Sequence, residues 1–227
     1  RTLSTVELFD PQVGCWEPLA PMPSPRSDFV AVAEEGRIYR LGGLDENYEA
    51  LDTCQRFDPD TNEWETLAPM RIPRWSFAVA AIGGRLFAIG GFADGQALGD
   101  VEVFDPRTGE WSSGSPMPTP RSALAVAAVG GKIFAMGGTC SGRGLALAVV
   151  ERYDPELDTW APLAPMPTPR SRFAAGSVAG RIYAIGGCCG SGVKALDALE
   201  RYDPETDQWE VLAGMPSRRS GAAVISC

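Results

Sequence analysis

The sequence predicts an all-β fold: a β-propeller built from four-stranded antiparallel blades. Three observations predict it. One unit of 47 to 49 residues recurs along the chain, four strand-like segments fill each copy, and turn-forming residues stand at fixed offsets within it. Because a single copy cannot bury its apolar residues alone, the copies are expected to stack around a common axis.

Four landmarks define the repeat. Asp-Pro pairs begin at Asp10, Asp58, Asp105, Asp154 and Asp203. Six residues later stand Trp16, Trp64, Trp111, Trp160 and Trp209. Ten residues after each tryptophan stand Arg26, Arg74, Arg121, Arg170 and Arg219. Seventeen residues after the first four arginines, a Gly-Gly pair closes at Gly43, Gly91, Gly138 and Gly187. Only the step from Gly-Gly to the next Asp-Pro varies in length, so insertions are confined to one loop of the unit.

The first half of the clearest copy predicts two strands. Residues 77–82 are apolar and small on both faces, which is typical of a strand buried on both sides and innermost in its blade. Gly83 and Gly84 predict a tight turn. Residues 85–89 predict the second strand, and the Gly-Gly pair after it would let a neighbouring backbone approach closely.

The second half predicts a loop and two more strands. A variable loop over residues 92–99 precedes a third strand at 101–104, whose alternation of apolar and polar residues predicts half exposure. Residues 105–109 carry the Asp, Pro and Gly of a turn. The fourth strand begins at Trp111 and ends before a proline-rich stretch, which suits an outer edge strand.

We therefore interpret residues 1–227 as one propeller domain. Its complete blades are residues 24–70, 71–117, 118–167 and 168–216, and partial blades are expected at residues 1–23 and 217–227. The last partial blade is expected to hold one innermost strand, at residues 221–225. The two ends together lack a second strand, so we expect a truncated propeller of six or more blades and a sequence that is a piece of a longer protein. A closed ring of five blades, one of them three-stranded, is the alternative.

Composition narrows the function. A net charge of −9 argues against a nucleic-acid or anionic-membrane surface, and no run of 18 apolar residues occurs. The chain has no histidine, which removes most metal sites and imidazole-based catalysis, so we expect no metal and no cofactor. The six cysteines are irregularly placed, which favours reduced thiols and a cytoplasmic location.

The glycine doublets, the Tyr/Phe-Asp-Pro motif and the tryptophan resemble the kelch repeat over nearly the whole chain. The resemblance implies a non-catalytic domain that binds a protein or peptide. Kelch propellers often recognise substrates in ubiquitin-ligase adaptors beside a BTB or F-box segment, and others scaffold the cytoskeleton. No such segment lies in these residues, so any cullin-type ligase would be bound through a domain outside this chain.

Strand direction predicts which face binds. In an antiparallel blade, the loop between strands two and three lies on the same face as the link between blades, and the tight turns lie on the other. Variable loops on one face of a repeat array are where binding is usually built. On this face the candidate partner-binding residues are Ser27, Asp28, Tyr48, Trp75, Phe92, Ser122, Arg143, Ser171, Arg172 and Ser220. The resemblance to kelch adaptors also implies Leu44, Thr139 and Cys188.

Three alternatives stay open. The arginine ring would either grip an anionic ligand or bond neighbouring carbonyls and carboxylates. Copper- and iron-dependent kelch enzymes resemble histidine-containing sites that this chain cannot build, but a kelch sugar mutarotase would need only carboxylates and arginines near the channel. Residues available for that chemistry are Asp28, Glu46, Asp94, Arg143 and Arg172. The third alternative is a structural subunit of a larger assembly.

Overall fold

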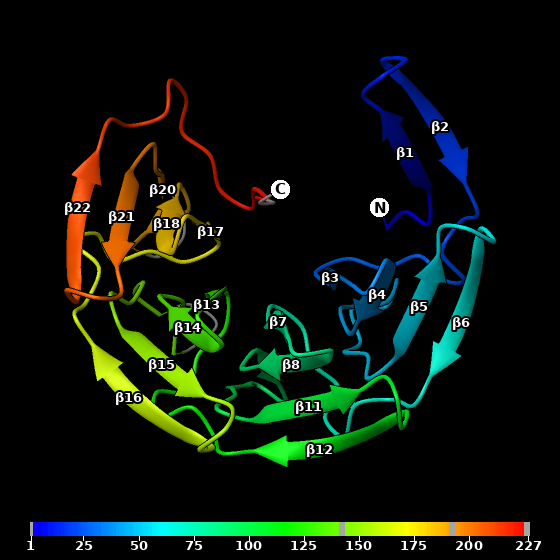
Figure 1. The fold of residues 1–227 in the computed structure, drawn as a ribbon, viewed down its shortest axis with the longest axis horizontal. Coiled ribbons are helices and arrows are strands. Elements are labelled where there is room, and N and C mark those ends of the chain that lie inside the picture. The colour runs from blue at the N-terminus through cyan, green and yellow to red at the C-terminus, as the bar shows by residue number, and fades with distance from the viewer. Residues whose placement is uncertain (1, 141–143, 191–193, 225–227) are drawn as a thin grey trace.

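The computed structural model describes residues 2–140, 144–190 and 194–224, and the strands in them form sheets arranged around one axis (Figure 1). In the described residues, four sheets have four strands each and three have two. The described residues contain no helix, and hence none that is long and apolar enough to span a membrane. The predicted all-β propeller is confirmed.

Each complete sheet uses four consecutive long strands, from the axis outward. The first holds β3 (Val30–Glu34), β4 (Arg37–Leu41), β5 (Cys54–Asp58) and β6 (Glu63–Leu67). The second holds β7 (Ala78–Ile82), β8 (Arg85–Ile89), β11 (Val101–Asp105) and β12 (Glu110–Gly114). The third holds β13 (Ala125–Val129), β14 (Lys132–Met136), β15 (Val150–Asp154) and β16 (Thr159–Leu163). The fourth holds β17 (Ala174–Val178), β18 (Arg181–Ile185), β21 (Leu199–Asp203) and β22 (Gln208–Leu212).

The two ends of the described chain flank an opening in the ring (Figure 1). At one side, β1 (Val6–Asp10) pairs only with β2 (Cys15–Leu19). These two strands hold the positions of the third and fourth strands of a complete sheet. At the other side, an innermost strand was expected at residues 221–225. This prediction is wrong for residues 221–224, which form no strand. No second strand stands beside them, so their backbone groups have no ladder to join. The five-blade alternative therefore fails for the described residues.

Neighbouring sheets pack face to face, and each interface is an apolar cluster. Between the second and third sheets, Phe87 and Ile89 contact Ile133, Ala135 and Tyr153. The tryptophan that opens each fourth strand also ties sheets together, since its indole N–H donates to a carbonyl at the end of the preceding sheet. The four bonds join Trp64 to Ala20, Trp111 to Ala68, Trp160 to Ser115 and Trp209 to Ala164, at 2.8–3.0 Å.

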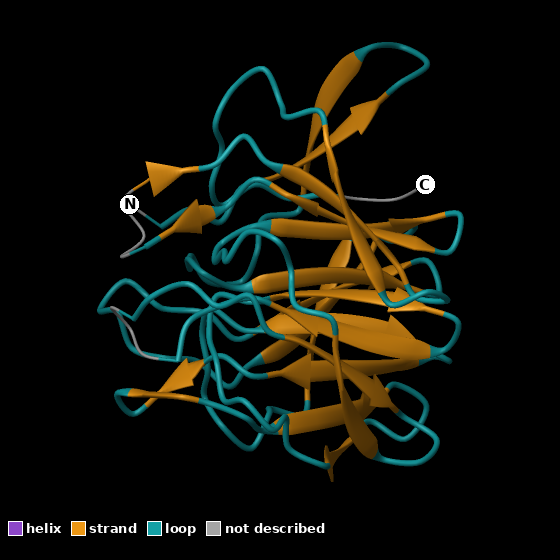
Figure 2. Ribbon diagram, turned by 90° about the vertical axis from the view of Figure 1, so that its left-hand side faces the viewer, coloured by secondary structure: helices purple, strands orange, loops and turns teal. Residues whose placement is uncertain are grey.

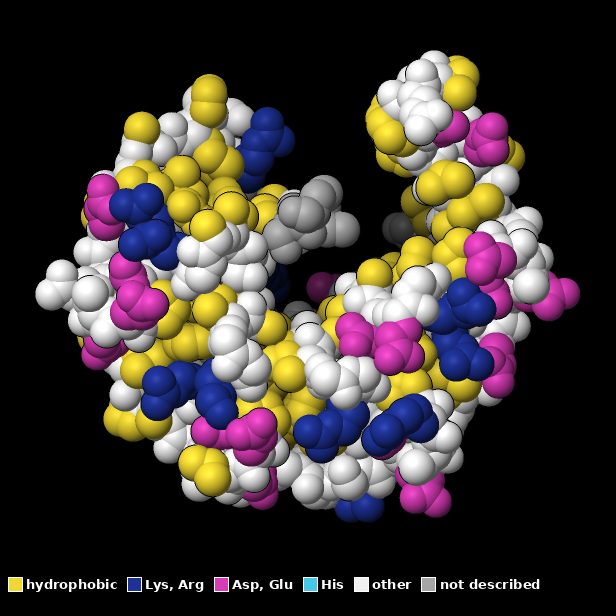
Figure 3. All heavy atoms as spheres, in the orientation of Figure 1, with side chains coloured by type: hydrophobic (Ala, Val, Ile, Leu, Met, Phe, Trp, Pro, Cys, Tyr) yellow, Lys and Arg dark blue, Asp and Glu magenta, His cyan; other side chains and the backbone are white. Residues whose placement is uncertain are grey.

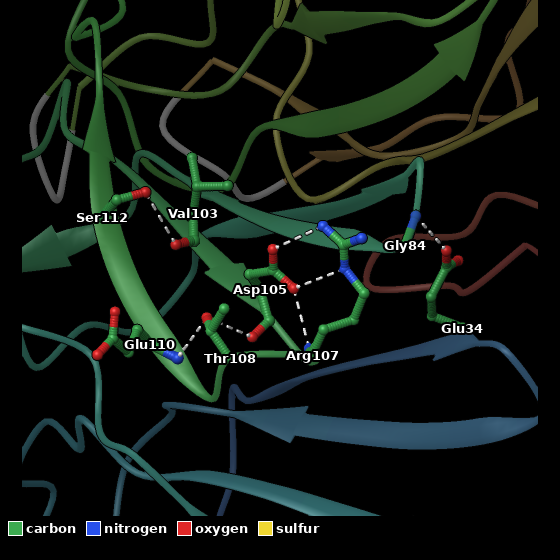
Figure 4. Close-up of polar contacts among 8 residues, drawn as sticks. All are labelled: Glu34, Gly84, Val103, Asp105, Arg107, Thr108, Glu110 and Ser112. Atoms are coloured by element: carbon green, nitrogen blue, oxygen red, sulfur yellow. Dashed lines mark hydrogen bonds and ion pairs between the residues drawn. The ribbon is translucent and has the colours of Figure 1, made fainter.

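The turn between the third and fourth strands is ordered by its own polar side chains (Figure 4). The Asp105 carboxylate accepts the backbone N–H of Arg107 at 2.9 Å and pairs with its guanidinium at 3.2 Å. Thr108 donates its hydroxyl to the Asp105 carbonyl and accepts the N–H of Glu110. The same picture shows Glu34 of the first sheet accepting the N–H of Gly84 in the second, at 3.0 Å.

The arginine of each link between complete sheets joins the two sheets at once. The backbone N–H of Arg74 donates to the Leu51 carbonyl, and its own carbonyl accepts the N–H of Gly43, both in the preceding sheet. Its side chain turns the other way and donates to the carbonyls of Gly90 and Asp100 in the following sheet. Arg74, Arg121 and Arg170 are completely buried. Two roles were open for the arginine ring, binding an anionic ligand or bonding neighbouring protein groups. The geometry shows the second, structural role.

The buried arginines are neutralised by glutamates on the third strands. Arg74 pairs with Glu102 at 2.5 Å, and the same ion pair joins Arg121 to Glu151 at 2.9 Å and Arg170 to Glu200 at 2.8 Å. Burial lowers the pKa of each arginine, and the glutamate beside it opposes that shift. The half-exposed third strand predicted at 101–104 is wrong, because Glu102 faces this buried guanidinium and all four residues are buried.

The Gly-Gly pairs are required by both backbone conformation and space. Gly90 and Gly91 have φ of 64° and 105°, in the left-handed region that favours glycine. A Cβ on Gly90 would lie 2.6 Å from the Arg121 carbonyl oxygen, and one on Gly91 would lie 2.7 Å from Cβ of Phe77. The close backbone approach predicted at these positions is confirmed.

Replacing Arg121 with alanine should lower the free energy of unfolding by about 3–5 kcal/mol, because the buried Glu151 carboxylate loses its cation. Arg219→Ala is the matched control, since Arg219 holds the same repeat position but is exposed. It should change the free energy by less than about 0.5 kcal/mol. Urea unfolding followed by tryptophan fluorescence measures both, and equal effects of the two substitutions would contradict the structural role of the buried ring.

Candidate partner-binding face

The links and the loops between second and third strands lie on one side of the ring, and the tight turns lie on the other (Figure 2). We call the first side the loop face, made by the links at 27–28, 75–76, 122–123, 171–172 and 220–221 and the described parts of loops 44–51, 92–98, 139–147 and 188–196. The first residue of each of the first four links pairs directly with the start of a loop. The bridges join Ser27 to Leu44, Trp75 to Phe92, Ser122 to Thr139 and Ser171 to Cys188.

The residue after each bridge is fixed by hydrogen bonds that run from blade to blade. The N–H of Ala123 donates to the Ser76 carbonyl at 2.7 Å, that of Arg172 to Ala123 at 2.9 Å, and that of Gly221 to Arg172 at 2.8 Å. These positions are all left-handed, and Asp28 shares that conformation with φ 51°. Asp28, Ser76, Ala123 and Arg172 each stand two residues before an innermost strand, and these strands line a central cavity of about 590 Å³. Asp28 and Arg172 therefore lie at its loop-face end.

Three aromatic side chains stand on the first two loops and links. Trp75 and Phe92 are half-buried and pack against each other, with ring centroids 5.4 Å apart. Tyr48 is 81% exposed and projects from a turn that Asp45 organises by accepting the N–H groups of Asn47 and Glu49, each at 2.8 Å. These hydrogen bonds, that from Glu49 first, lower the pKa of Asp45. An exposed aromatic on an ordered turn is a typical anchor for a protein partner.

Charge is divided across the loop face. The acidic side chains Asp28, Glu46, Glu49 and Asp94 belong to the first two blades and are exposed. Arg172 and Lys194 belong to the last two blades and are also exposed. Arg143 lies outside the described residues. Among the residues that the structure describes, this division provides complementarity to a ligand with charges of both signs.

The candidate residues are not equally accessible. Asp28, Tyr48, Arg172 and Ser220 are exposed, while Ser27, Trp75 and Phe92 are half-buried. Ser122 and Ser171 lie on the loop face, but their side chains are buried. Their hydroxyls lie 3.4 Å from Oγ1 of Thr139 and 3.5 Å from Sγ of Cys188, so they fasten loops instead of facing solvent.

Two features escaped the sequence reasoning. The loops at 92–98 and 188–196 contain two-residue strands, which pair as β9 (Phe92–Ala93) with β10 (Gln96–Ala97) and β19 (Cys188–Cys189) with β20 (Lys194–Ala195). Glu102, Glu151 and Glu200 were also missed, although an acidic residue at one repeat position in three blades was a readable signal. Within the described ranges, no group of three or more histidine, cysteine, aspartate or glutamate residues is arranged to hold a metal ion.

The opposite face is uniform. Figure 3 shows groups of neighbouring basic and acidic side chains at intervals around the ring on this face, with hydrophobic side chains between them. The ion pairs recur at one repeat position, joining Arg37 to Asp58, Lys132 to Asp154 and Arg181 to Asp203 at 2.8–3.0 Å. Because the repeat itself explains them, they offer no specific site, whereas the loop face differs from blade to blade.

Comparison with known proteins gives two family matches. Residues 1–187 match the family model described as the KLHDC2/KLHL20/DRC7 Kelch-repeats domain, and residues 169–216 match the one described as the Kelch motif. No curated protein matches the chain. Among solved structures, "Structure of YjhT" superposes with a TM-score of 0.82 at 17% identity, covering 98% of this chain and 86% of that one. At this identity the likeness shows the fold alone.

The cysteines should react according to burial. The five in the described residues form no disulfide, and Cys15 and Cys140 are exposed whereas Cys54 and Cys188 are buried. Burial raises the pKa of the Cys54 thiol to about 12. At neutral pH, maleimide should modify Cys15 and Cys140 in the folded protein, and Cys54 and Cys188 only after denaturation. Peptide mass mapping checks this, and equally fast labelling of Cys54 and Cys140 would contradict it.

Proposed function

The chain belongs to the Kelch-repeat family, and from this we propose that it is a non-catalytic interaction domain that binds a partner protein or peptide on its loop face. The observation that carries the proposal is the contrast between the two faces. One repeats the same ion pairs in three of the four sheets, and the other presents loops of different length, charge and aromatic content on a fixed frame.

The proposed ligand is an extended peptide or loop that crosses the end of the central cavity. Its acidic part would lie near Arg172 and Lys194, and its basic part near Asp28, Glu46 and Asp94, because these exposed side chains have the opposite charge. Tyr48, Trp75 and Phe92 would supply the apolar contact that binding energy depends on.

We extend the proposal to the class of protein. A Kelch-repeat domain of this kind would act in the cytoplasm as the substrate-recognition part of a ubiquitin-ligase adaptor, or as a scaffold. The adaptor role needs a cullin-binding domain outside these residues. The family membership supports this interpretation, and the partner that the loop face selects would decide between the two roles.

The double substitution Tyr48→Ala, Arg172→Ala should abolish capture of the specific partner or weaken its Kd at least about tenfold, since it removes an exposed anchor and an exposed charge. Neither side chain is buried, so thermal unfolding should be unchanged. Affinity capture with quantitative mass spectrometry identifies the partner, and titration of the purified pair measures the Kd.

The matched control is Arg107→Ala on the turn face, where the guanidinium is 82% exposed and pairs with Asp105. It should leave the Kd unchanged. If the turn-face variant loses partners that the loop-face variant keeps, the proposed binding face is wrong.

A further inference from the structure

Ser24 lies in a proline-rich segment between strands that two other blades repeat. The sequence Pro-Met-Pro-Ser/Thr-Pro-Arg occurs at residues 21–26, 116–121 and 165–170, so Ser24, Thr119 and Thr168 hold the same position. All three are half-buried, and the prolines on both sides of each are exposed. A serine or threonine that is followed by proline on such a surface segment is the kind of acceptor that proline-directed protein kinases phosphorylate.

The hydroxyl of Ser24 lies against two buried guanidiniums. Its Oγ accepts a hydrogen bond from Arg26 at 2.9 Å and another from Arg40 at 3.3 Å, and its carbonyl accepts one from Arg40 at 3.1 Å. Arg26 is 4% exposed and Arg40 is 1% exposed. Thr119 instead donates its hydroxyl to the carboxylate of Glu151 at 2.8 Å. Two cations therefore surround the hydroxyl at position 24, whereas an anion holds the one at position 119.

Two positions of the first sheet create this pair of cations. Arg40 stands where the other three complete sheets have alanine, and Gln55 stands where they have the glutamate that neutralises the link arginine. The other acceptors of Arg26 are the Gly42 carbonyl and the Thr53 hydroxyl, and that of Arg40 is the side-chain oxygen of Gln55. All of these groups are neutral, so the described residues give neither arginine a carboxylate.

The arrangement is internal to one link and the sheet that follows it. All the acceptors of Arg26 and Arg40 lie between Ser24 and Gln55, and every residue of this range is described. In the other sheets the neutralising glutamate also comes from the sheet after the link, and the sheet after Arg26 is complete. The absence of a carboxylate at Arg26 is therefore a property of this link and sheet.

The two guanidiniums repel each other. Burial, and then the charge of Arg26, lower the pKa of Arg40 to about 9, and burial also lowers the pKa of Arg26. Arg40 is still mostly protonated at neutral pH, so the first sheet holds two buried positive charges close to one hydroxyl. An anion placed on that hydroxyl would neutralise both, since charge-assisted hydrogen bonds to guanidinium are among the strongest in proteins.

We propose that Ser24 is a phosphorylation site and that Arg26 and Arg40 are the built-in receptor for its phosphate. A protein kinase transfers the γ-phosphoryl group of ATP to Oγ of Ser24. The P–O bond to Oγ forms, the bond to the ADP leaving group breaks, and the hydroxyl proton passes to the base of the kinase. The phosphate brings a charge of about −1.5 to −2 and three acceptor oxygens to the two guanidiniums.

This site is separate from the loop face and does not depend on the function proposed for it. The phosphate is part of the chain itself, so Arg26 keeps the structural role of a link arginine. The repeat also predicts a difference between equivalent positions. A phosphate at Ser24 gains two cations and stabilises the fold, whereas one at Thr119 meets the carboxylate of Glu151 and destabilises it.

Genetically encoded phosphoserine tests the receptor at both positions. Relative to unmodified serine at the same position, Ser24→phosphoserine should raise the Tm by at least about 2–4 °C, because new charge-assisted hydrogen bonds form. Thr119→phosphoserine is the matched control and should lower the Tm. Thermal unfolding followed by tryptophan fluorescence measures both. A Tm that is unchanged or lowered by phosphoserine at position 24 overturns the proposal.

The ionisation of the phosphate gives a second readout. Phosphorus NMR should show its second pKa falling from about 6 to below about 5 at position 24, because nearby cations favour the doubly charged form. The gain in Tm should therefore be complete above about pH 6 and be lost as the pH falls through the folded pKa. At position 119 the pKa should stay at about 6 or rise. Equal pKa values at the two positions would contradict the receptor.

Two variants identify the cations as the cause. Arg40→Ala installs the residue of the other three sheets and removes one cation, and Gln55→Glu installs their carboxylate and neutralises the pair. Both are expected to fold, since each restores a residue that the other sheets already use. In either variant, phosphoserine at position 24 should lose at least half of its gain in Tm. A full gain in both variants shows that the arginines do not receive the phosphate.

A kinase reaction tests the modification itself. The purified chain is incubated with a proline-directed protein kinase and ATP, and phosphopeptide mapping should find phosphate on Ser24. A chain that takes no phosphate there overturns the proposal. Inorganic phosphate, added to the unmodified chain at constant ionic strength, should leave the Tm unchanged. If it raises the Tm as much as phosphoserine does, the two arginines bind a free anion, and the assignment to Ser24 is wrong.

Discussion

The link arginine is the interaction on which the rest of the molecule depends. Its backbone belongs to one sheet and its side chain to the next, so a single residue sets both the spacing and the angle between them. Burial of a guanidinium is unfavourable unless carbonyls and a carboxylate surround it. The next sheet supplies carbonyls along and after its second strand and a glutamate on its third. Where the described chain has no next sheet, the side chain of Arg219 stays exposed although its backbone bonds are the same. The contacts of the side chain therefore require the stacking of blades, and they leave it no role in binding a ligand.

This frame explains why diversity is confined to one face. The carbonyl of each link arginine approaches the Gly-Gly pair of the preceding sheet so closely that no side chain fits there, which fixes the point where every loop begins. The loop is held again at its end, where a leucine carbonyl accepts the N–H of the next link arginine. Between these two points its length and charge are free to differ. The tight turns on the other face are bound by ion pairs that the repeat dictates. Rigid attachment and variable tips together make a surface on which specificity can be built.

Most of the fold followed from the spacing of glycine, proline, tryptophan and strand-like segments, because these residues act locally and recur. The strands and turns of residues 77–114 were predicted closely for this reason. The misses are residues whose role is set by a distant partner. Glu102 has the pattern of an exposed strand residue, and only the three-dimensional placement of Arg74 makes it buried. Residues 221–224 have a strand's composition but no neighbour to pair with. On the loop face, the position of each candidate residue was readable, but the burial of Ser122 and Ser171 depends on Thr139 and Cys188 across the bridge.

Because the sheets repeat one another, the other three serve as references for the first. At two positions the first sheet differs from them, and both differences make its buried charge more positive. Arg40 stands where the other three sheets have alanine, and it adds a buried cation. Gln55 stands where they have glutamate, so the first sheet lacks their buried anion. The link site has a net charge of zero in the other sheets and of plus two here. If these two differences had been selected only for stability, their changes in buried charge would be expected to cancel, because each uncompensated buried charge is destabilising. At the other side of the opening, the last sheet keeps Ala184 and the Arg170–Glu200 pair. The two sheets are thus electrostatically different, with two uncompensated buried arginines in the first and a neutralised arginine in the last.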